Sequence, residues 1–329
     1  MHGGLYINEN EITRFFHNRG GFLFVALTSV VMTLAAFFAG VIPPLTGEDG
    51  LFFLPPGEWI ANPITSLVVS LAVNFMTGYA MVLITKQFNT IRSLSRLMAT
   101  FFIIMQTATP ALMGEFSSGT FLTAVMVLET ALLFSCYDNK AAIRRIFLLF
   151  FILTSCGLCC FSMLLYIPFF LPALAQMRMF GFRQVIAALI GVITPFWLLL
   201  GFGVITLDDF YIPEIYTIIN CIPSLTLPQF SVIVLTTLSG IIFMVSNLMK
   251  LLSYNAQIRA YNGFLLLMFF ATLLLMFVDT NSITVYIPML NLTAAYQIAH
   301  FFAERRHRRS YLAIIATTLP YLAIYLWNL

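Results

Sequence analysis

Residues 146–177 read IFLLFFILTSCGLCCFSMLLYIPFFLPALAQM, and the way this stretch crosses a membrane decides the topology of the whole chain. The stretch carries no charge, and its 32 residues are too many for one ordinary transmembrane helix of about 20 residues. Pro168 and Pro172 interrupt it, and basic residues flank it on both sides. We therefore predict a short hairpin that turns near Tyr166 and returns to its starting side, either as two short crossings or as one re-entrant hairpin.

The composition of the chain is that of an α-helical integral membrane protein. The 329 residues are 60% hydrophobic and 9% charged, whereas soluble domains carry about 25% charged residues. Besides the hairpin, apolar runs long enough to span a bilayer predict helices at 21–42, 64–85, 97–113, 120–136, 184–204, 230–249, 263–278, 284–302 and 311–328. We therefore expect an all-α transmembrane bundle with about eleven crossings.

The positions of the basic residues predict the orientation of this bundle. If 146–177 returns to its own side, every Lys and Arg faces the cytoplasm, as the positive-inside rule requires; a single crossing would put the later basic loops outside. The cytoplasmic N-terminal segment is then 1–20, and the C-terminus lies outside. The 16 basic residues are Arg14, Arg19, Lys86, Arg92, Arg96, Lys140, Arg144, Arg145, Arg178, Arg183, Lys250, Arg259, Arg305, Arg306, Arg308 and Arg309.

No loop is long enough to form a soluble domain. We therefore expect residues 1–329 to form a single integral membrane domain in the inner membrane of a bacterium. The sequence contains no Gly-rich phosphate loop, no H-E-x-x-H and no G-x-S-x-G, which argues against an ATPase or a standard hydrolase. Membrane lipid is the expected partner, together with a lipid-linked substrate or an envelope protein, and nothing indicates nucleic-acid binding.

Two resemblances bear on function. Residues 118–133 (SGTFLTAVMVLETALL), 166–171 (YIPFFL) and 182–196 (FRQVIAALIGVITPF) resemble a family of uncharacterised polytopic membrane proteins of Bacteroidota, over less than half the chain. More loosely, the chain is similar to the multi-span glycosyltransferases that use polyprenyl-phosphate sugars. Those enzymes start inside, cross about eleven times and hold an acidic residue in the first outer loop, where this chain has Glu48-Asp49. Its loop 43–63 is shorter than theirs.

The outer loops 43–63 and 205–229 each carry an adjacent acid pair, Glu48-Asp49 and Asp208-Asp209. Carboxylates can bind a divalent metal that bridges a substrate phosphate, and one of them can act as a general base. We predict that the two loops meet over one outward cavity, with Asp49 and Asp208 as catalytic residues and Glu48 and Asp209 as substrate or metal ligands. The alternative is that these acids are simply solvated. No outer Lys or Arg is available to hold a pyrophosphate.

Four polar residues fall at mid-membrane depth in the predicted spans: Asn74, Gln106, Glu129 and Asn291. An ionised carboxylate there costs several kcal/mol unless it is paired or faces water. These residues either line a polar cavity or a proton-coupled path, or they make packing contacts, with Glu129 protonated and hydrogen-bonded to a neighbouring helix.

Two further groups have competing interpretations. Arg305, Arg306, Arg308 and Arg309 either contact anionic lipid headgroups or act only as a topology anchor, and nearby His300 is expected at the membrane interface. Cys156, Cys159 and Cys160 have the spacing of a metal or redox motif, or are small side chains packed in a helix. The functional hypothesis is an outward-facing glycosyl or lipid-linked group transferase; a scaffold subunit and a transporter or flippase that uses Glu129 are the alternatives.

Overall fold

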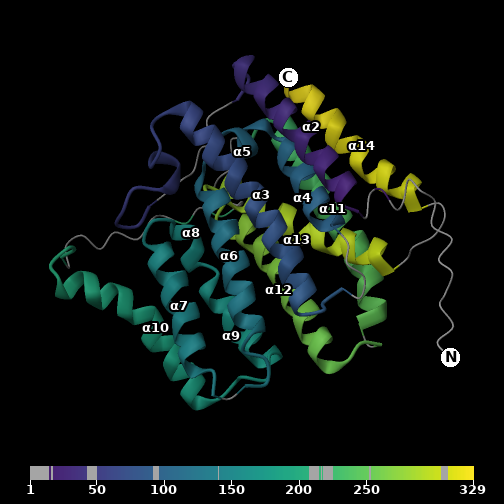
Figure 1. Ribbon diagram of the computed structural model, residues 1–329. Coiled ribbons are helices and arrows are strands. Elements are labelled where there is room, and N and C mark those ends of the chain that lie inside the picture. Colours follow the sequence, from purple (N-terminus) through teal and green to yellow (C-terminus); the bar gives the residue numbers. More distant parts are fainter. Residues whose placement is uncertain are drawn as a thin grey trace.

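The computed structural model describes Phe15, Ile215, Thr217 and residues 18–42, 50–91, 96–139, 141–206, 225–251, 253–304 and 310–329. All regular structure in these residues is helical (Figure 1). The helices are α2 (Arg19–Phe38), η1 (Pro56–Glu58), α3 (Pro63–Gln87), α4 (Leu97–Ala108), α5 (Pro110–Gly114), α6 (Ser118–Phe134), α7 (Ile143–Gly157), α8 (Phe161–Leu164), α9 (Ile167–Gln176), α10 (Phe182–Gly201), α11 (Leu227–Leu251), α12 (Ala256–Val278), α13 (Ile283–Glu304) and α14 (Ser310–Asn328).

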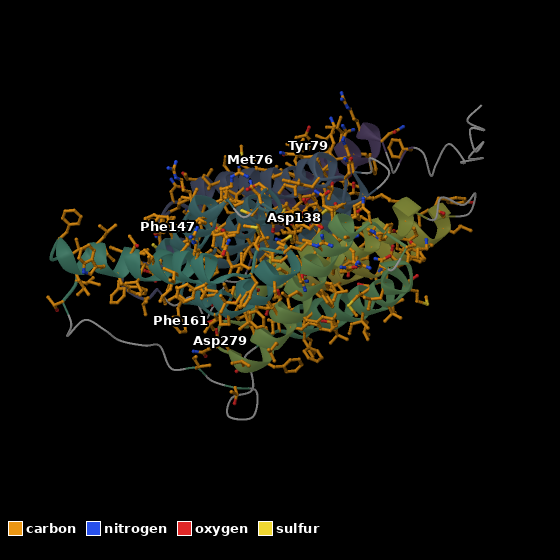
Figure 2. All side chains as sticks on the ribbon, turned by 90° about the horizontal axis from the view of Figure 1, so that it is seen from below. Met76, Tyr79, Asp138, Phe147, Phe161 and Asp279 are labelled. Carbon is orange, nitrogen blue, oxygen red and sulfur yellow. The ribbon has the colours of Figure 1, made fainter. Side chains whose placement is uncertain are left out.

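Six of these helices, namely α2, α3, α10, α11, α12 and α14, are long and apolar enough to cross a membrane. Their outward faces carry large apolar side chains, which are compatible with a lipid environment. Met76 of α3, for example, is 70% exposed and lies with Tyr79 at the edge of the molecule (Figure 2). The chain therefore has the features of a multi-pass membrane protein.

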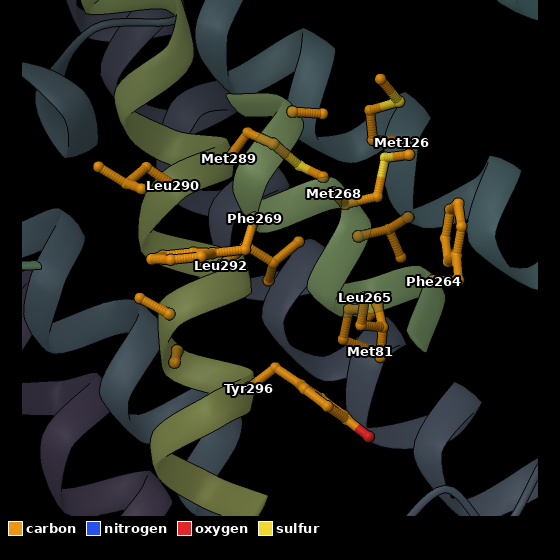
Figure 3. Close-up of a cluster of buried hydrophobic side chains, with 14 of the residues drawn as sticks. Met81, Met126, Phe264, Leu265, Met268, Phe269, Met289, Leu290, Leu292 and Tyr296 are labelled. Carbon is orange, nitrogen blue, oxygen red and sulfur yellow. The ribbon is translucent and has the colours of Figure 1, made fainter. Parts of the chain in front are cut away.

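Helix α13 occupies the centre of the bundle. Every residue from 282 to 300 is buried, and the helix packs against α4, α6, α11 and α12. Figure 3 shows Met289, Leu290 and Leu292 of α13 among buried side chains of α3, α6 and α12. A Cβ atom at Gly119 of α6 would lie 2.8 Å from the carbonyl oxygen of Val285, so glycine permits the close approach of α6 to α13.

Helices α7, α8 and α9 form the hairpin at 146–177. Asp138, just before α7, donates its backbone N–H to the carbonyl of Met177, just after α9 (3.1 Å), so the chain returns to the level at which it entered. At the other end the Leu158 carbonyl accepts from the N–H groups of Leu51 (3.2 Å) and Phe52 (3.1 Å). The tip of the hairpin therefore lies on the same side of the bundle as residues 50–54.

Two expectations about helix boundaries were wrong in position. The hairpin reverses over residues 158–166 rather than at Tyr166, because α7 ends at Gly157 and Pro168 lies in the first turn of α9. Proline is favoured there, since a first-turn N–H has no acceptor within the helix. The expected helix 97–113 is divided at Thr109, because Pro110 cannot donate the N–H that would continue α4 into α5.

Candidate functional site

A hollow of about 330 Å³ lies where the C-terminal end of α2 meets the N-terminal end of α3 and the end of α5. In the predicted orientation it opens to the outside. Its volume is in the range of small-ligand pockets, which is about 300–1,000 Å³. Its lining residues are Phe37, Gly40, Ile42, Ile60, Ala61, Pro63, Ser66, Gly114 and Glu115.

Local hydrogen bonds hold the wall of this hollow in place. The Asn62 Oδ1 atom accepts from the N–H groups of Ile64 (3.0 Å) and Thr65 (3.4 Å), which fixes the start of α3. Ser66 Oγ then accepts from the backbone N–H of Phe116 (2.9 Å), so α3 is tied to the segment that follows α5. These bonds form within the protein alone, and a ligand would therefore find the wall already formed.

The electrostatics of the hollow come from one carboxylate and one helix end. Glu115 is the acidic residue among its lining residues, and the first turn of α3 contributes the partial positive charge of a helix N-terminus. The sequence between the predicted spans on this side contains no Lys, Arg or His. Because Pro63 has no N–H and Asn62 already accepts from Ile64 and Thr65, a phosphate in the hollow would depend on a cation that carboxylates can bind.

A second, apolar groove of about 200 Å³ lies between α2 and α14 and is floored by α4. Phe24, Met32, Ile104, Leu319 and Leu322 are among its apolar lining residues. Figure 1 shows α2 and α14 side by side, and Tyr325 OH donates to the carbonyl of Met32 (2.7 Å) near their C-terminal ends. Both helices are long enough to span a bilayer, so an apolar groove between them is compatible with contact to acyl chains.

Three of the four predicted mid-membrane polar residues form one chain of hydrogen bonds. Gln106 Nε2 donates to Asn74 Oδ1 (2.9 Å), and Asn291 Nδ2 donates to Gln106 Oε1 (2.9 Å). Thr236 Oγ1 continues the chain to Asn291 Oδ1 (3.2 Å) and also contacts Tyr321 OH (3.2 Å). This polar chain, Asn74–Gln106–Asn291–Thr236–Tyr321, connects α3, α4, α13, α11 and α14, and its members pair with one another inside the bundle.

Asn74 of the polar chain and Asn328 of α14 also donate hydrogen bonds to backbone carbonyls near the break between α4 and α5. Asn74 Nδ2 donates to the carbonyls of Ser70 (3.0 Å) and Leu112 (3.2 Å). Asn328 of α14 donates to the carbonyl of Ala108 (3.0 Å) at the end of α4. Backbone carbonyls that are not bonded within a helix are costly in a membrane, and side chains of two other helices pair with them here.

Glu129 lies apart from this polar chain. It is fully buried in α6, and neither carboxylate oxygen has a hydrogen-bond partner among the described residues. The Cys156 thiol of α7 is close enough to Glu129 to interact with it electrostatically. The described residues thus place Glu129 beside the hairpin, without the neighbouring hydrogen-bond partner that a purely structural carboxyl would have.

The remaining predicted site residues, Glu48, Asp49, Asp208, Asp209, Arg305, Arg306, Arg308 and Arg309, lie outside the described residues. Among the described residues, the first outer loop contacts α10, the helix that precedes the second of these loops. The rings of Phe52, in the first outer loop, and Phe196 of α10 are 6.3 Å apart. Phe196 lies five residues before the end of α10, and α10 leads into the loop that carries Asp208 and Asp209.

No group of three or more His, Cys, Asp or Glu in the described part of the chain is arranged to hold a metal ion. None of Cys136, Cys156, Cys159 and Cys160 forms a disulfide within the part of the chain that the structure describes. Cys156 lies in α7, whereas Cys159 and Cys160 lie in the turn of the hairpin, so the three do not share one helix.

Sequence reasoning gave no particular role to several residues that the structure brings into these sites. Ser66 and Glu115 line the hollow, and Thr236 and Tyr321 extend the polar chain. Pro110 could have predicted the hollow, because a proline there ends α4 and α5 then packs against α2. No comparable pattern marks Thr236 or Tyr321, because hydroxyls are common in transmembrane helices.

Comparison with known proteins gives no relative: no family model, no curated protein and no solved structure matches the chain.

Proposed function

We propose that this chain is an outward-facing transferase of cell-envelope biogenesis in the bacterial inner membrane, acting on a glycosyl or other group carried on a lipid phosphate. The observation that carries the proposal is the hollow formed by α2, α3 and α5, which combines a pocket-sized volume, Glu115 and the N-terminus of a spanning helix. A donor carried on a lipid phosphate presents its polar group at the membrane surface, and a hollow at the end of a span is placed to receive it.

Two of the predicted site residues, Glu48 and Asp49, are close in sequence to a residue that lines the hollow. Ile42 is a lining residue and directly precedes the segment that carries Glu48 and Asp49. The contact of Phe52 with Phe196 supports the proposed approach of the first outer loop to the loop with Asp208 and Asp209. In the proposed site, carboxylates from these loops and Glu115 bind a divalent cation that neutralises the donor phosphate, and Asp49 or Asp208 serves as the general base.

The apolar groove between α2 and α14 supports the lipid-linked part of the proposal. It lies on α2, the same helix whose C-terminal end lines the hollow. A lipid chain in the groove would leave its phosphate near the membrane surface, at the level of the hollow. The described residues form eleven helical segments in sequence, counting α4 with α5 as one and leaving out η1 and the short α8 in the turn of the hairpin, which supports the expected crossing number.

The test compares three variants, Glu115→Gln, Asp49→Asn and Asp208→Asn, with the control Glu58→Gln. The amounts of envelope glycan and of lipid-linked intermediates are measured in cells that contain equal amounts of each variant. Glu58 is a matched control, because it is an exposed acid of the same outer loop as Asp49 and does not line the hollow. We expect the first three variants to accumulate donor and lose product, with Glu58→Gln as wild type. Normal glycan in all three would reject the transferase and favour a scaffold.

Proton-coupled transport is a second candidate, favoured by Glu129. A buried intramembrane carboxyl with no hydrogen-bond partner among the described residues is a functional-site candidate in its own right. Glu129→Gln keeps the shape of the side chain but cannot exchange a proton. If Glu129→Gln abolishes the cellular phenotype while Glu115→Gln does not, the transport function replaces the transferase.

A further inference from the structure

Two basic segments of the chain meet at the open end of the hairpin, opposite to its tip. Residues 138–145 lead into α7 and residues 177–183 lead from α9 into α10, and together they contain five basic residues and one acidic residue, Asp138. The Asp138 N–H, bonded to the Met177 carbonyl (3.1 Å), holds the two segments next to each other. In the predicted orientation this end of the bundle faces the cytoplasm.

Helices α7 and α10 both begin at this end and lie side by side at one edge of the molecule (Figure 1). A Cβ atom at Gly191 of α10 would lie 2.7 Å from the carbonyl oxygen of Phe147 in α7, so glycine lets the two backbones approach closely. The close packing keeps the first turns of the two helices at one end of a single unit.

Four arginines of the two segments have exposed side chains, namely Arg144, Arg145, Arg178 and Arg183. Arg145 Nη1 donates to the carbonyl of Ser135 (2.7 Å), which holds this guanidinium at the start of α7. Arginines from both sides of the hairpin therefore form one exposed basic surface, defined by these four residues.

Helix electrostatics add to the positive charge of this basic surface. Neither α7 nor α10 has a side-chain cap or an acidic residue in its first turn. The first turns carry arginines instead, Arg144 and Arg145 in α7 and Arg183 in α10. Their charge adds to the partial positive charge of a helix N-terminus, so a bound anion lowers the energy of this end of the fold.

Two aromatic side chains beside the arginines select the kind of anion. Phe180 and Phe182 lie between Arg178 and Arg183 in the sequence and are 65% and 82% exposed. A soluble anion would leave both rings in water. A bilayer surface takes up aromatic rings at the boundary of its acyl chains, while arginines beside them reach the headgroups.

We propose that the basic surface at the start of α7 and α10 binds the headgroups of anionic phospholipids in the cytoplasmic leaflet, with Phe180 and Phe182 inserted beside the acyl chains. A guanidinium pairs with phosphate oxygens through two parallel hydrogen bonds, and a leaflet with anionic lipid attracts each added basic residue. This surface is separate from the outward hollow and does not depend on the transferase function.

The test titrates the full chain, purified in a non-ionic detergent, with phosphatidylglycerol or with phosphatidylcholine of the same acyl chains. Native mass spectrometry measures the fraction of the protein that retains each lipid. Both lipids carry a phosphate, so the comparison isolates the net negative charge of the headgroup. We expect phosphatidylglycerol to be retained at a concentration at least about fivefold lower. Equal retention of the two lipids would overturn the proposal.

Variants separate a defined site from general attraction by surface charge. Arg144→Gln and Arg183→Gln should each weaken phosphatidylglycerol binding by about fivefold, the effect expected of one basic residue at an anionic surface. Arg259→Gln is the matched control, because Arg259 is an exposed arginine in the first turn of α12 and belongs to a different predicted cytoplasmic loop. It should bind as wild type. Equal weakening by Arg259→Gln and Arg183→Gln would reject a site at α7 and α10.

Stability in phosphatidylcholine gives the second readout. Because the arginines are exposed and repel the helix N-termini, Arg144→Gln and Arg183→Gln should unfold there at the same temperature as wild type or at a higher one. A variant that is less stable in phosphatidylcholine and keeps the full response to phosphatidylglycerol would show that its arginine is structural, which contradicts the proposal. If one of the two variants does not fold, the other decides.

Discussion

Gln106 is the central residue of the polar chain, and Gln106→Leu tests whether that chain stabilises the bundle. The substitution keeps a similar volume but removes both the bond to Asn74 Oδ1 and the bond from Asn291 Nδ2, each 2.9 Å long. Hydrogen bonds between transmembrane helices are worth about 0.6–2 kcal/mol each. We therefore expect Gln106→Leu to lower the free energy of unfolding by about 1–4 kcal/mol.

The assay is equilibrium unfolding by denaturant in mixed micelles, monitored by circular dichroism. Gln257→Leu is the matched control, since Gln257 is an exposed glutamine with one bond, to Tyr261 OH, and should cost less than about 0.5 kcal/mol. The double variant Gln106→Leu with Asn291→Leu should lose less than the sum of the single losses, because the two residues share a bond. A Gln106→Leu variant as stable as Gln257→Leu would refute this reasoning.

Two other substitutions probe the fold. Glu129→Leu should unfold at the same denaturant concentration as wild type or a higher one, because no described side chain bonds to this carboxyl; a clear loss of stability would reveal a partner. Gly191→Ala would place a Cβ atom 2.7 Å from the Phe147 carbonyl oxygen where α10 crosses α7, and should cost about 1–3 kcal/mol of unfolding free energy. Gly201→Ala, in the same helix with open space around it, is the control, and equal stability of the two alanine variants would contradict the close packing.

Much of the helical architecture was predictable from apolar runs and basic residues. Apolar runs of spanning length predicted most of the helices. The basic residues on either side of 146–177 predicted that this stretch returns to the side on which it starts, and the hydrogen bond from Asp138 to Met177 brings its two ends together. The boundaries depend on local chemistry that a hydropathy pattern averages out. Pro110 divides an apolar run without changing its hydropathy, and Pro168 begins a helix instead of ending one.

The candidate sites were less predictable than the fold, for reasons of geometry. The sequence indicates that Asn74, Gln106 and Asn291 lie at similar depth, but their pairing depends on how each helix is rotated about its axis. Glu129 has a similar depth and faces a different neighbour, α7. The hollow depends on the direction that α5 takes after its break. His300 was expected at the membrane interface, because it lies near a helix end, but the packing of its neighbours buries it.

The central claim is that the hollow formed by α2, α3 and α5 opens to the outside of the membrane, and cysteine labelling tests it most directly. In a cysteine-free variant, Ala61→Cys places a thiol at the exposed wall of the hollow, and Gln257→Cys places one at the exposed start of α12. In intact spheroplasts a membrane-impermeant maleimide should label position 61 at once and position 257 only after permeabilisation. Labelling of position 257 in intact cells, with position 61 protected until permeabilisation, would contradict the orientation and, with it, the proposed outward-facing site.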